Sequence, residues 1–124
     1  MKETSISRAT AEHYSWGLDC DGWHLVKDAA LSVIEEQMPP GSSEMLHSHR
    51  SAQQFFYILS GKVTMQIERE EVRLQAGEGL HILPRVRHRM SNRSGEVTRF
   101  LVISQPPSHG DRVCETVGLL KVPL

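Results

Sequence analysis

The sequence predicts an all-β protein, a sandwich or barrel of short strands. The clearest strand covers residues 62–69, KVTMQIER, where Val63, Met65 and Ile67 share one face and polar residues occupy the other. Breaks formed by glycine, proline and polar residues recur at 39–41, 60–61, 77–79 and 94–95. Helical periodicity is almost absent, and frequent turns between alternating segments are typical of sandwiches and barrels.

The other strands are expected as short segments between these breaks. Before the clearest strand they cover residues 23–27, 31–38, which ends at the Pro-Pro-Gly break, 45–49, and 53–59, which ends at the Ser-Gly turn. After it they cover residues 72–75 and 80–83 on either side of the Gly-Glu-Gly turn, 88–92, and 97–104 after the Ser-Gly break. Eight or nine strands of this length favour one closed or sandwiched β domain.

A chain of 124 residues is the size of one compact domain, so any site must lie within it. We expect one domain over 1–124, with N-terminal strands in 12–28, a barrel over about 30–104 and a C-terminal arm over 105–124. The segment from residue 106 starts with two prolines and could be an arm that pairs with an edge strand or with a second subunit. A loosely ordered tail is the alternative. Edge pairing of the terminal strands predicts a homodimer.

Charge and hydropathy exclude several classes of partner. The 14 Lys and Arg residues nearly balance 15 Asp and Glu, so no basic surplus indicates nucleic acid as a partner. The longest apolar runs, 55–59 and 100–103, are too short to cross a membrane. The polar start lacks the apolar segment of a secretory signal, so we expect a cytoplasmic protein whose Cys20 and Cys114 remain thiols.

The seven histidines are the chain's most unusual feature, and three of them have a reason to meet. His47 and His49 are two apart on a predicted strand, so both side chains leave the same face. Gln54 begins the next strand, and His88 could reach the same interior if the sheet closes into a barrel. Imidazole nitrogens with an amide oxygen suit Fe, Ni, Cu, Zn or Mn, and open coordination positions would make such a site catalytic.

At these residues the sequence resembles the cupin superfamily. Its first motif, G-x5-H-x-H-x3,4-E-x6-G, is matched at every interval by Gly41, His47, His49, Gln54 and Gly61. The resemblance covers about residues 30–104 and implies a double-stranded β-helix, or jelly-roll barrel, with a divalent transition metal ion at His47, His49, Gln54 and His88.

The second cupin motif, G-x5-P-x-G-x2-H-x3-N, is matched only in part. Gly77, His88 and Asn92 are present, but Leu83 and Arg85 stand where the motif has proline and its second glycine.

The fourth position of the first motif departs from the family. Gln54 stands in place of the usual glutamate, while Gln53, which fits the shorter spacing, should point to the opposite face. A neutral donor leaves a bound dication more electrophilic and less suited to ions that prefer carboxylates. Gln54 could instead orient a histidine or a bound water. Glu44 is a possible replacement carboxylate, but its odd offset from His47 predicts that it faces the other side.

Strand parity also predicts a wall beside the ion. Phe56 and Ile58 share the parity of Gln54, and Met90 shares that of His88, so these side chains line either a substrate pocket or the core. The remaining histidines are expected to be surface or structural residues: His13, His24, His81 and His109. The arginines beside His88 are expected to lie on a solvated edge, unless Arg87 or Arg89 faces the cavity mouth and attracts a carboxylate or phosphate.

The resemblance leaves two functions open, because cupins include both enzymes and binding proteins. One is a metal-dependent enzyme, a dioxygenase or other Lewis-acid catalyst, that acts on a small anionic or enolisable organic molecule. The other is a module that binds or senses a small metabolite without turnover and holds a structural metal. The sequence identifies no catalytic acid or base, so it does not decide between them.

Overall fold

The computed structural model describes residues 4–114 and contains strands but no helix within that range. Eleven strands are present: β1 (Glu12–Trp16), β2 (Cys20–Lys27), β3 (Ser32–Met38), β4 (His47–His49), β5 (Gln53–Ser60), β6 (Lys62–Ile67), β7 (Glu70–Gln75), β8 (Gly79–Ile82), β9 (His88–Ser91), β10 (Thr98–Gln105) and β11 (Arg112–Cys114). Every strand predicted from the sequence is present. The all-β prediction is therefore confirmed.

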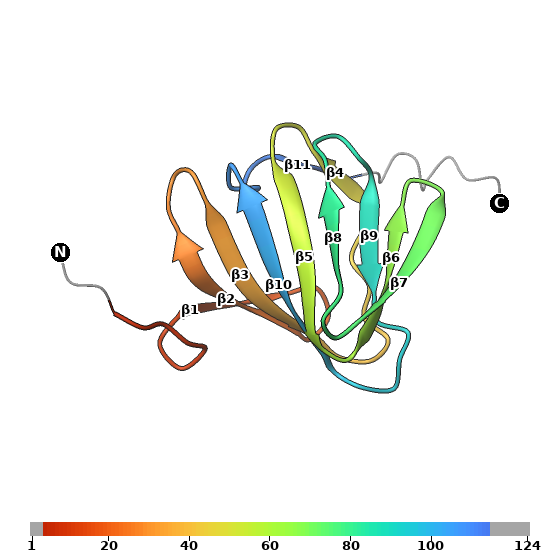
Figure 1. Ribbon diagram of the computed structural model, residues 1–124, viewed down its shortest axis with the longest axis horizontal. Helices are drawn as coiled ribbons and strands as arrows, with labels where there is room; N and C mark the ends of the chain where they lie inside the picture. The colour runs from red at the N-terminus through yellow and green to blue at the C-terminus, as the bar shows by residue number, and fades with distance from the viewer. Residues whose placement is uncertain (1–3, 115–124) are drawn as a thin grey trace.

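The strands form two antiparallel sheets that enclose the interior of a jelly roll (Figure 1). The larger sheet has the order β1-β2-β3-β10-β5-β8, and the smaller sheet has the order β11-β4-β9-β6-β7. Sequential neighbours often lie in different sheets, as β3 and β4 do, because the chain crosses repeatedly between the two layers. Within the part of the chain that the structure describes, no helix is long and apolar enough to cross a membrane.

Two strand boundaries differ from the sequence prediction in a way that affects the site. The strand expected at 45–49 begins only at His47, so Met45 precedes the ladder. The strand expected at 62–69 ends at Ile67, and Glu68 has a positive φ of 52° in the turn that follows. Alternation therefore predicts side-chain direction from residue 47 onward but not before it.

The C-terminal arm contributes an additional strand to the smaller sheet. Residues 112–114 form β11, which pairs with β4 and places Arg112 opposite His49 and Cys114 opposite His47. The described part of the arm therefore pairs with a strand of its own chain, which is one of the alternatives predicted from the sequence. The segment 115–124 lies outside the described residues.

Part of the interior between the sheets is a packed core. Its fully buried side chains include Met38, Ile58, Met65, Met90 and Phe100. These side chains pack closely against one another. The remainder of the interior contains a cavity, which lies next to β1, β2, β4 and β11. Both cysteines are free thiols, as the sequence predicts, with Cys20 buried and Cys114 exposed.

Candidate metal centre

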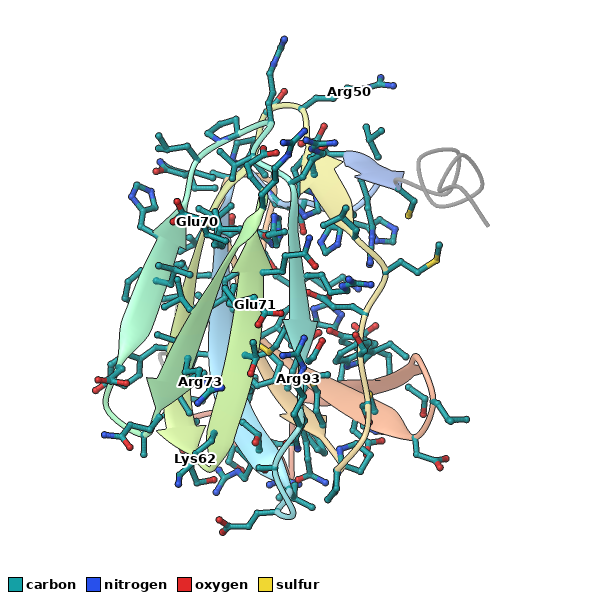
Figure 2. All side chains as sticks on the ribbon, turned by 90° about the vertical axis from the view of Figure 1, so that its right-hand side faces the viewer. Arg50, Lys62, Glu70, Glu71, Arg73 and Arg93 are labelled. Atoms are coloured by element: carbon teal, nitrogen blue, oxygen red, sulfur yellow. The ribbon has the colours of Figure 1, made fainter. Side chains whose placement is uncertain are left out.

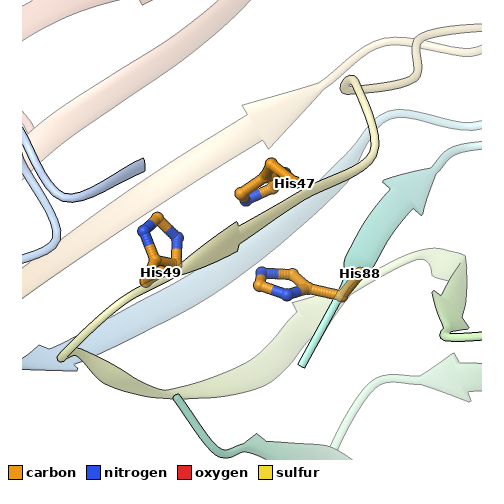
Figure 3. A group of neighbouring side chains, drawn as sticks. All are labelled: His47, His49 and His88. Atoms are coloured by element: carbon orange, nitrogen blue, oxygen red, sulfur yellow. The ribbon is translucent and has the colours of Figure 1, made fainter. Parts of the chain in front are cut away.

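Three histidine rings converge inside the barrel (Figure 3). β4 directs His47 and His49 inward on the same face, and β9 pairs with β4 so that His88 lies opposite His47. The ring centroids of His47 and His88 are 4.3 Å apart, and those of His47 and His49 are 5.1 Å apart. The exposed fractions are 3%, 5% and 0% for His47, His49 and His88. Each ring offers a nitrogen within 4.8 Å of the others, so one ion could contact all three.

Backbone carbonyl groups determine which ring nitrogens face the interior. Nδ1 of His47 donates a hydrogen bond to the carbonyl oxygen of Met45 at 2.7 Å, and Nδ1 of His88 donates to that of Val86 at 2.9 Å. In neutral rings, the Nε2 atoms then carry the free lone pairs. Such carbonyl contacts also orient histidines that bind metals in proteins.

His49 gives the most direct test of whether a cation fits. Both of its ring nitrogens are buried, and neither has a hydrogen-bond partner among the described residues. A buried polar atom without a partner costs free energy, and an ion bound by the ring would supply the missing interaction. The observed geometry therefore fits a metal ion.

The three rings are held in the form that can bind a metal. Burial, together with the neighbouring His88, lowers the pKa of His47 to about 3 and that of His49 to about 4. Burial also lowers the pKa of His88, against the opposing effect of its bond to Val86. At neutral pH all three imidazoles are therefore uncharged.

Gln54 lies beside this cluster, at the start of β5. Its Oε1 is 3.1 Å from Nε2 of His88, and its amide nitrogen donates to Oγ of Ser104 at 3.0 Å. With the His88 proton on Nδ1, both atoms of the 3.1 Å contact are acceptors, an arrangement that a cation between them would stabilise. Gln53 instead faces outward and contacts His81, as parity predicts.

A cavity of about 650 Å³ is lined by His47 and His49, while the fully buried His88 is not among its lining residues. Phe56, one of the three predicted wall residues, lines it. Ile58 and Met90 belong to the core cluster and are not among the lining residues. The reason is distance along the strand, because Ile58 lies four residues beyond Gln54, about 13 Å deeper into the interior.

Glu44 does not face away from the histidines as its offset predicts. It lines the cavity with His47 and His49, and its Oε1 accepts a hydrogen bond from the backbone nitrogen of Met90 at 3.0 Å. The parity argument is wrong here because residue 44 precedes β4 and does not have alternating strand geometry. The Glu44 carboxylate does not belong to the cluster of His47, His49 and His88, whose nitrogens lie within 4.8 Å of one another. It therefore does not replace the missing carboxylate ligand at position 54.

Glu36 is a further carboxyl group of the cavity, and it is not among the site residues that the sequence predicts. Glu36 on β3 accepts a hydrogen bond from Oη of Tyr14 on β1 at 2.5 Å. Burial raises the pKa of Glu36 to about 8 and that of Glu44 to about 7. Both side chains retain some accessible surface because they face the cavity. The sequence does contain a signal for Glu36. It lies on the same face of its strand as Ile34 and Met38, so alternation predicts that this acidic side chain points into the barrel.

The positive charge near the histidines also differs from expectation. Arg87 forms an ion pair with Glu68, and Arg89 donates to Gln66, so the arginines beside His88 do not line the cavity. Arg112 on β11 lines it instead, together with His24 and His109, which were predicted to be surface or structural residues. No local pattern marks Arg112, because only the pairing of β11 with β4 brings it there.

These features define the class of protein: a small jelly roll with a buried triad of histidines beside a cavity. The chain belongs to the cupin family, whose cupin-domain profile matches residues 34–104. The uncharacterized protein MJ1618 of Methanocaldococcus jannaschii is 30% identical over 89 residues, which are 71% of each chain.

Two further comparisons extend the likeness. The tetracenomycin polyketide synthase protein TcmJ of Streptomyces glaucescens is 30% identical over 70 residues, which span 56% of this chain and 47% of that protein. An RmlC-like cupin from Shewanella frigidimarina has a similar structure, with a TM-score of 0.77, 17% identity and coverage of 88% of this chain and 96% of that one. At this identity, the structural likeness shows the fold alone.

Proposed function

We propose that this cupin is a metal-dependent enzyme, a Lewis-acid catalyst acting on a small organic molecule with a carbonyl group beside an acidic C–H bond. The observation that carries this proposal is the presence of two carboxyl groups with raised pKa values, Glu36 and Glu44, in the cavity that the neutral rings of His47 and His49 line. A general acid or base works best when its pKa is near the working pH.

The histidines would hold a divalent ion of iron, nickel, manganese, copper or zinc. His47, His49 and His88 are the proposed ligands, and Gln54 either adds its amide oxygen or orients His88. Such an ion supplies a Lewis acid that polarises a substrate oxygen and so acidifies the adjacent C–H bond. Because all these donors are neutral, none of them reduces the charge of the ion.

Glu44 is the proposed proton acceptor. Its Oε1 is held by the backbone nitrogen of Met90, and Oε2 has no hydrogen-bond partner among the described side chains and backbone groups. One oxygen is thus fixed while the other is available to the substrate. Burial keeps its pKa at about 7, so the carboxyl group can both accept and return a proton near neutrality.

Glu36 and Tyr14 would provide the polar wall of the same cavity. The Tyr14 hydroxyl donates to Glu36, which fixes the orientation of that carboxyl group. Trp16, Ile34, Phe56 and Val102 provide apolar lining that limits the access of water. Phe56 is therefore our proposed substrate contact, whereas Ile58 and Met90 support the pocket through the core.

One observation favours the alternative function, a module that binds a metabolite without converting it. Glu36 and Glu44 already accept hydrogen bonds from Tyr14 and Met90, contacts that a purely structural carboxyl group would also make. In that case the cavity would bind the ligand and the metal would orient it.

Exchange of substrate protons for deuterium distinguishes the two functions. The metal-loaded protein is incubated in D₂O with pyruvate and a panel of small 2-oxo and 3-oxo acids, and loss of the C–H signal is followed by NMR. We expect catalysed exchange that Glu44→Gln reduces by at least about 100-fold, the low end of what general acid–base catalysis contributes. Glu70→Gln, an equal charge change on the distant strand β7, should leave it unchanged (Figure 2). Binding of these acids without any exchange would support the alternative.

We further propose that the protein works in the cytoplasm as a homodimer. The free thiols of Cys20 and Cys114 are consistent with a reducing compartment. Phe55, Tyr57 and Leu59 expose more than a third of their surface on the outer face of β5, which suits contact with a second copy. Light scattering after size-exclusion chromatography measures the mass in solution, and a monomer at micromolar concentration would contradict the dimer.

A further inference from the structure

Arg112 places a guanidinium group at the mouth of the metal cavity. Its cross-strand partner is His49, so its side chain leaves β11 on the face that carries the histidines. Nη2 lies 3.2 Å from Nδ1 of His47. None of the six contacts between a basic and an acidic side chain found among residues 4–114 includes Arg112.

The contact with His47 does not satisfy this guanidinium. The Met45 carbonyl oxygen lies 2.7 Å from Nδ1 of His47 and can only accept, so that nitrogen must carry the hydrogen. An N–H group cannot also accept a hydrogen bond from Arg112. In the described part of the chain, the guanidinium therefore has donors directed at the cavity and no acceptor for them.

A clamp at the start of β11 fixes the backbone next to Arg112. The carboxylate of Asp111 accepts hydrogen bonds from the backbone nitrogens of Arg50, Ser51 and Ala52, at 3.1, 2.9 and 3.0 Å. These bonds also lower the pKa of Asp111, so the clamp is charged at neutral pH. Because the clamp joins β11 to the loop that follows His49, the backbone of Arg112 is positioned before any ligand arrives, which reduces the entropy lost on binding.

The balance of charge indicates the ligand that this arrangement requires. The three histidines are neutral, and a bound dication together with Arg112 would place three positive charges in and beside the cavity. The carboxyl groups of Glu36 and Glu44 face the same cavity, but burial raises their pKa values to about 8 and 7, so near neutral pH they offset only part of this charge. Lys27, another cation of the lining, is already paired with Glu12 at 3.1 Å. A ligand with one anionic group and a nearby oxygen donor would compensate both centres at once.

We propose that the cavity selects small carboxylates, with the guanidinium of Arg112 binding the carboxylate and a second oxygen of the ligand facing His47, His49 and His88. This inference rests on the proposed function and names its substrate class: an acid with a keto, hydroxy or second carboxyl oxygen close to the carboxylate. Arg112 is then a residue that determines specificity. It lies outside the segment 34–104 that matches the cupin family, so the family match does not account for it.

Malonate and malonamide provide a direct test. They share the same three-carbon skeleton with a carbonyl oxygen at each end, but malonamide has a neutral NH2 group where malonate has its second carboxylate oxygen, so only malonate is charged. Binding of each to the metal-loaded protein is measured by calorimetry, and the metal content is measured before and after by elemental analysis. We expect malonate to bind in preference to malonamide, and Arg112→Gln to weaken malonate by about 10- to 100-fold, as loss of a charged hydrogen bond does. Metal content and malonamide binding should not change.

Two variants separate the geometry of Arg112 from its charge. Arg112→Lys keeps the charge but loses the planar fork, so we expect a partial loss of malonate binding. Arg73→Gln removes the same charge from the distant strand β7 and should bind malonate like the wild type (Figure 2). If Arg73→Gln weakened malonate binding as much as Arg112→Gln does, the proposal would be overturned, because the weaker binding would then follow from the net charge of the protein.

Three other outcomes would also overturn it: no preference of the wild type for malonate, unchanged binding by a folded Arg112→Gln protein, or tighter binding of inorganic phosphate than of malonate. The readout is binding, so failure of catalysis leaves this test intact. Should the protein fail to retain a metal, the same preference is measured on the metal-free protein as a shift in melting temperature. Loss of that shift in Arg112→Gln would support Arg112 even though the proposed metal function had failed.

Discussion

The hydroxyl group of Tyr14 reaches over a neighbouring strand to donate a 2.5 Å hydrogen bond to Glu36. Tyr14 on β1 lies opposite Gly22 on β2, which in turn lies opposite Glu36 on β3. A side chain at position 22 would occupy the space of the phenol ring, since an added Cβ would lie 2.2 Å from Cζ of Tyr14. The N-terminal strands thus contribute directly to the wall of the metal cavity.

Gly22→Ala should therefore destabilise the protein. The new methyl group must displace the Tyr14 ring, and overpacking of this kind costs about 1–3 kcal/mol. Chemical denaturation measures the loss. Gly95→Ala is the matched control, because its Cβ would meet nothing within 4 Å. Adding Tyr14→Ala to Gly22→Ala should remove most of the penalty, and a double variant with fully additive losses would contradict the steric explanation.

Glu36→Gln should raise stability increasingly as the pH rises. Burial raises the pKa of Glu36 from 4.5 to about 8, so between these values the unfolded chain releases a proton that the folded protein retains. The wild type thus loses free energy of unfolding across this range, and a neutral glutamine does not. The difference in melting temperature between variant and wild type should grow from pH 4.5 to about 8 and then level off.

This comparison is made on metal-free protein, so that binding of an ion does not contribute to the melting temperature. Glu70→Gln on the surface of β7 is the control for a change in net charge. A difference between Glu36→Gln and wild type that stays constant from pH 4.5 to 8 would contradict the raised pKa.

His49→Ala should abolish most metal binding. Loss of a direct ligand is expected to cost more than the roughly 10- to 100-fold that loss of an outer hydrogen-bond partner costs. Competition with a metal-binding dye measures the affinity. His81→Ala is the matched control, because His81 is exposed on β8 and contacts Gln53 outside the cavity. Equal affinities for the two variants would exclude His49 as a ligand.

Gln54→Glu should strengthen the binding of Mn(II) more than that of Cu(II). A carboxylate reduces the charge of the site and suits harder ions better than an amide does. The paired variant Gln53→Glu carries the same change on the opposite face of β5, so it should leave both affinities unchanged. If Gln54→Glu also leaves them unchanged, Gln54 acts only by orienting its neighbours.

Local sequence patterns predict the strands and the shared face of His47 and His49, whereas the convergence of His88 with them is predicted only through closure of the sheet and the resemblance to cupins. His47 and His49 share a face because side chains of a strand alternate, and a closed all-β fold brings His88 to them. The departure at Gln54 was also visible in the sequence, as was the outward direction of Gln53. The shared face of His47 and His49 and the opposite directions of Gln53 and Gln54 depend on spacing along one strand, which is a local property of the chain, whereas the place of His88 depends on the pairing of β9 with β4.

The rest of the site was decided by tertiary structure. Glu44 enters the cavity because the chain before His47 does not follow strand geometry, and Arg112 does so because β11 pairs with β4 more than sixty residues away. Parity also does not show which part of the interior is cavity and which is core, so Phe56 lines the pocket while Ile58 on the same face is packed. The sequence, through strand alternation and its resemblance to cupins, therefore predicts the all-β fold and the members of the histidine centre. Only the closure of the two sheets placed the carboxyl groups and the guanidinium around it, because those contacts join strands that are distant in the chain.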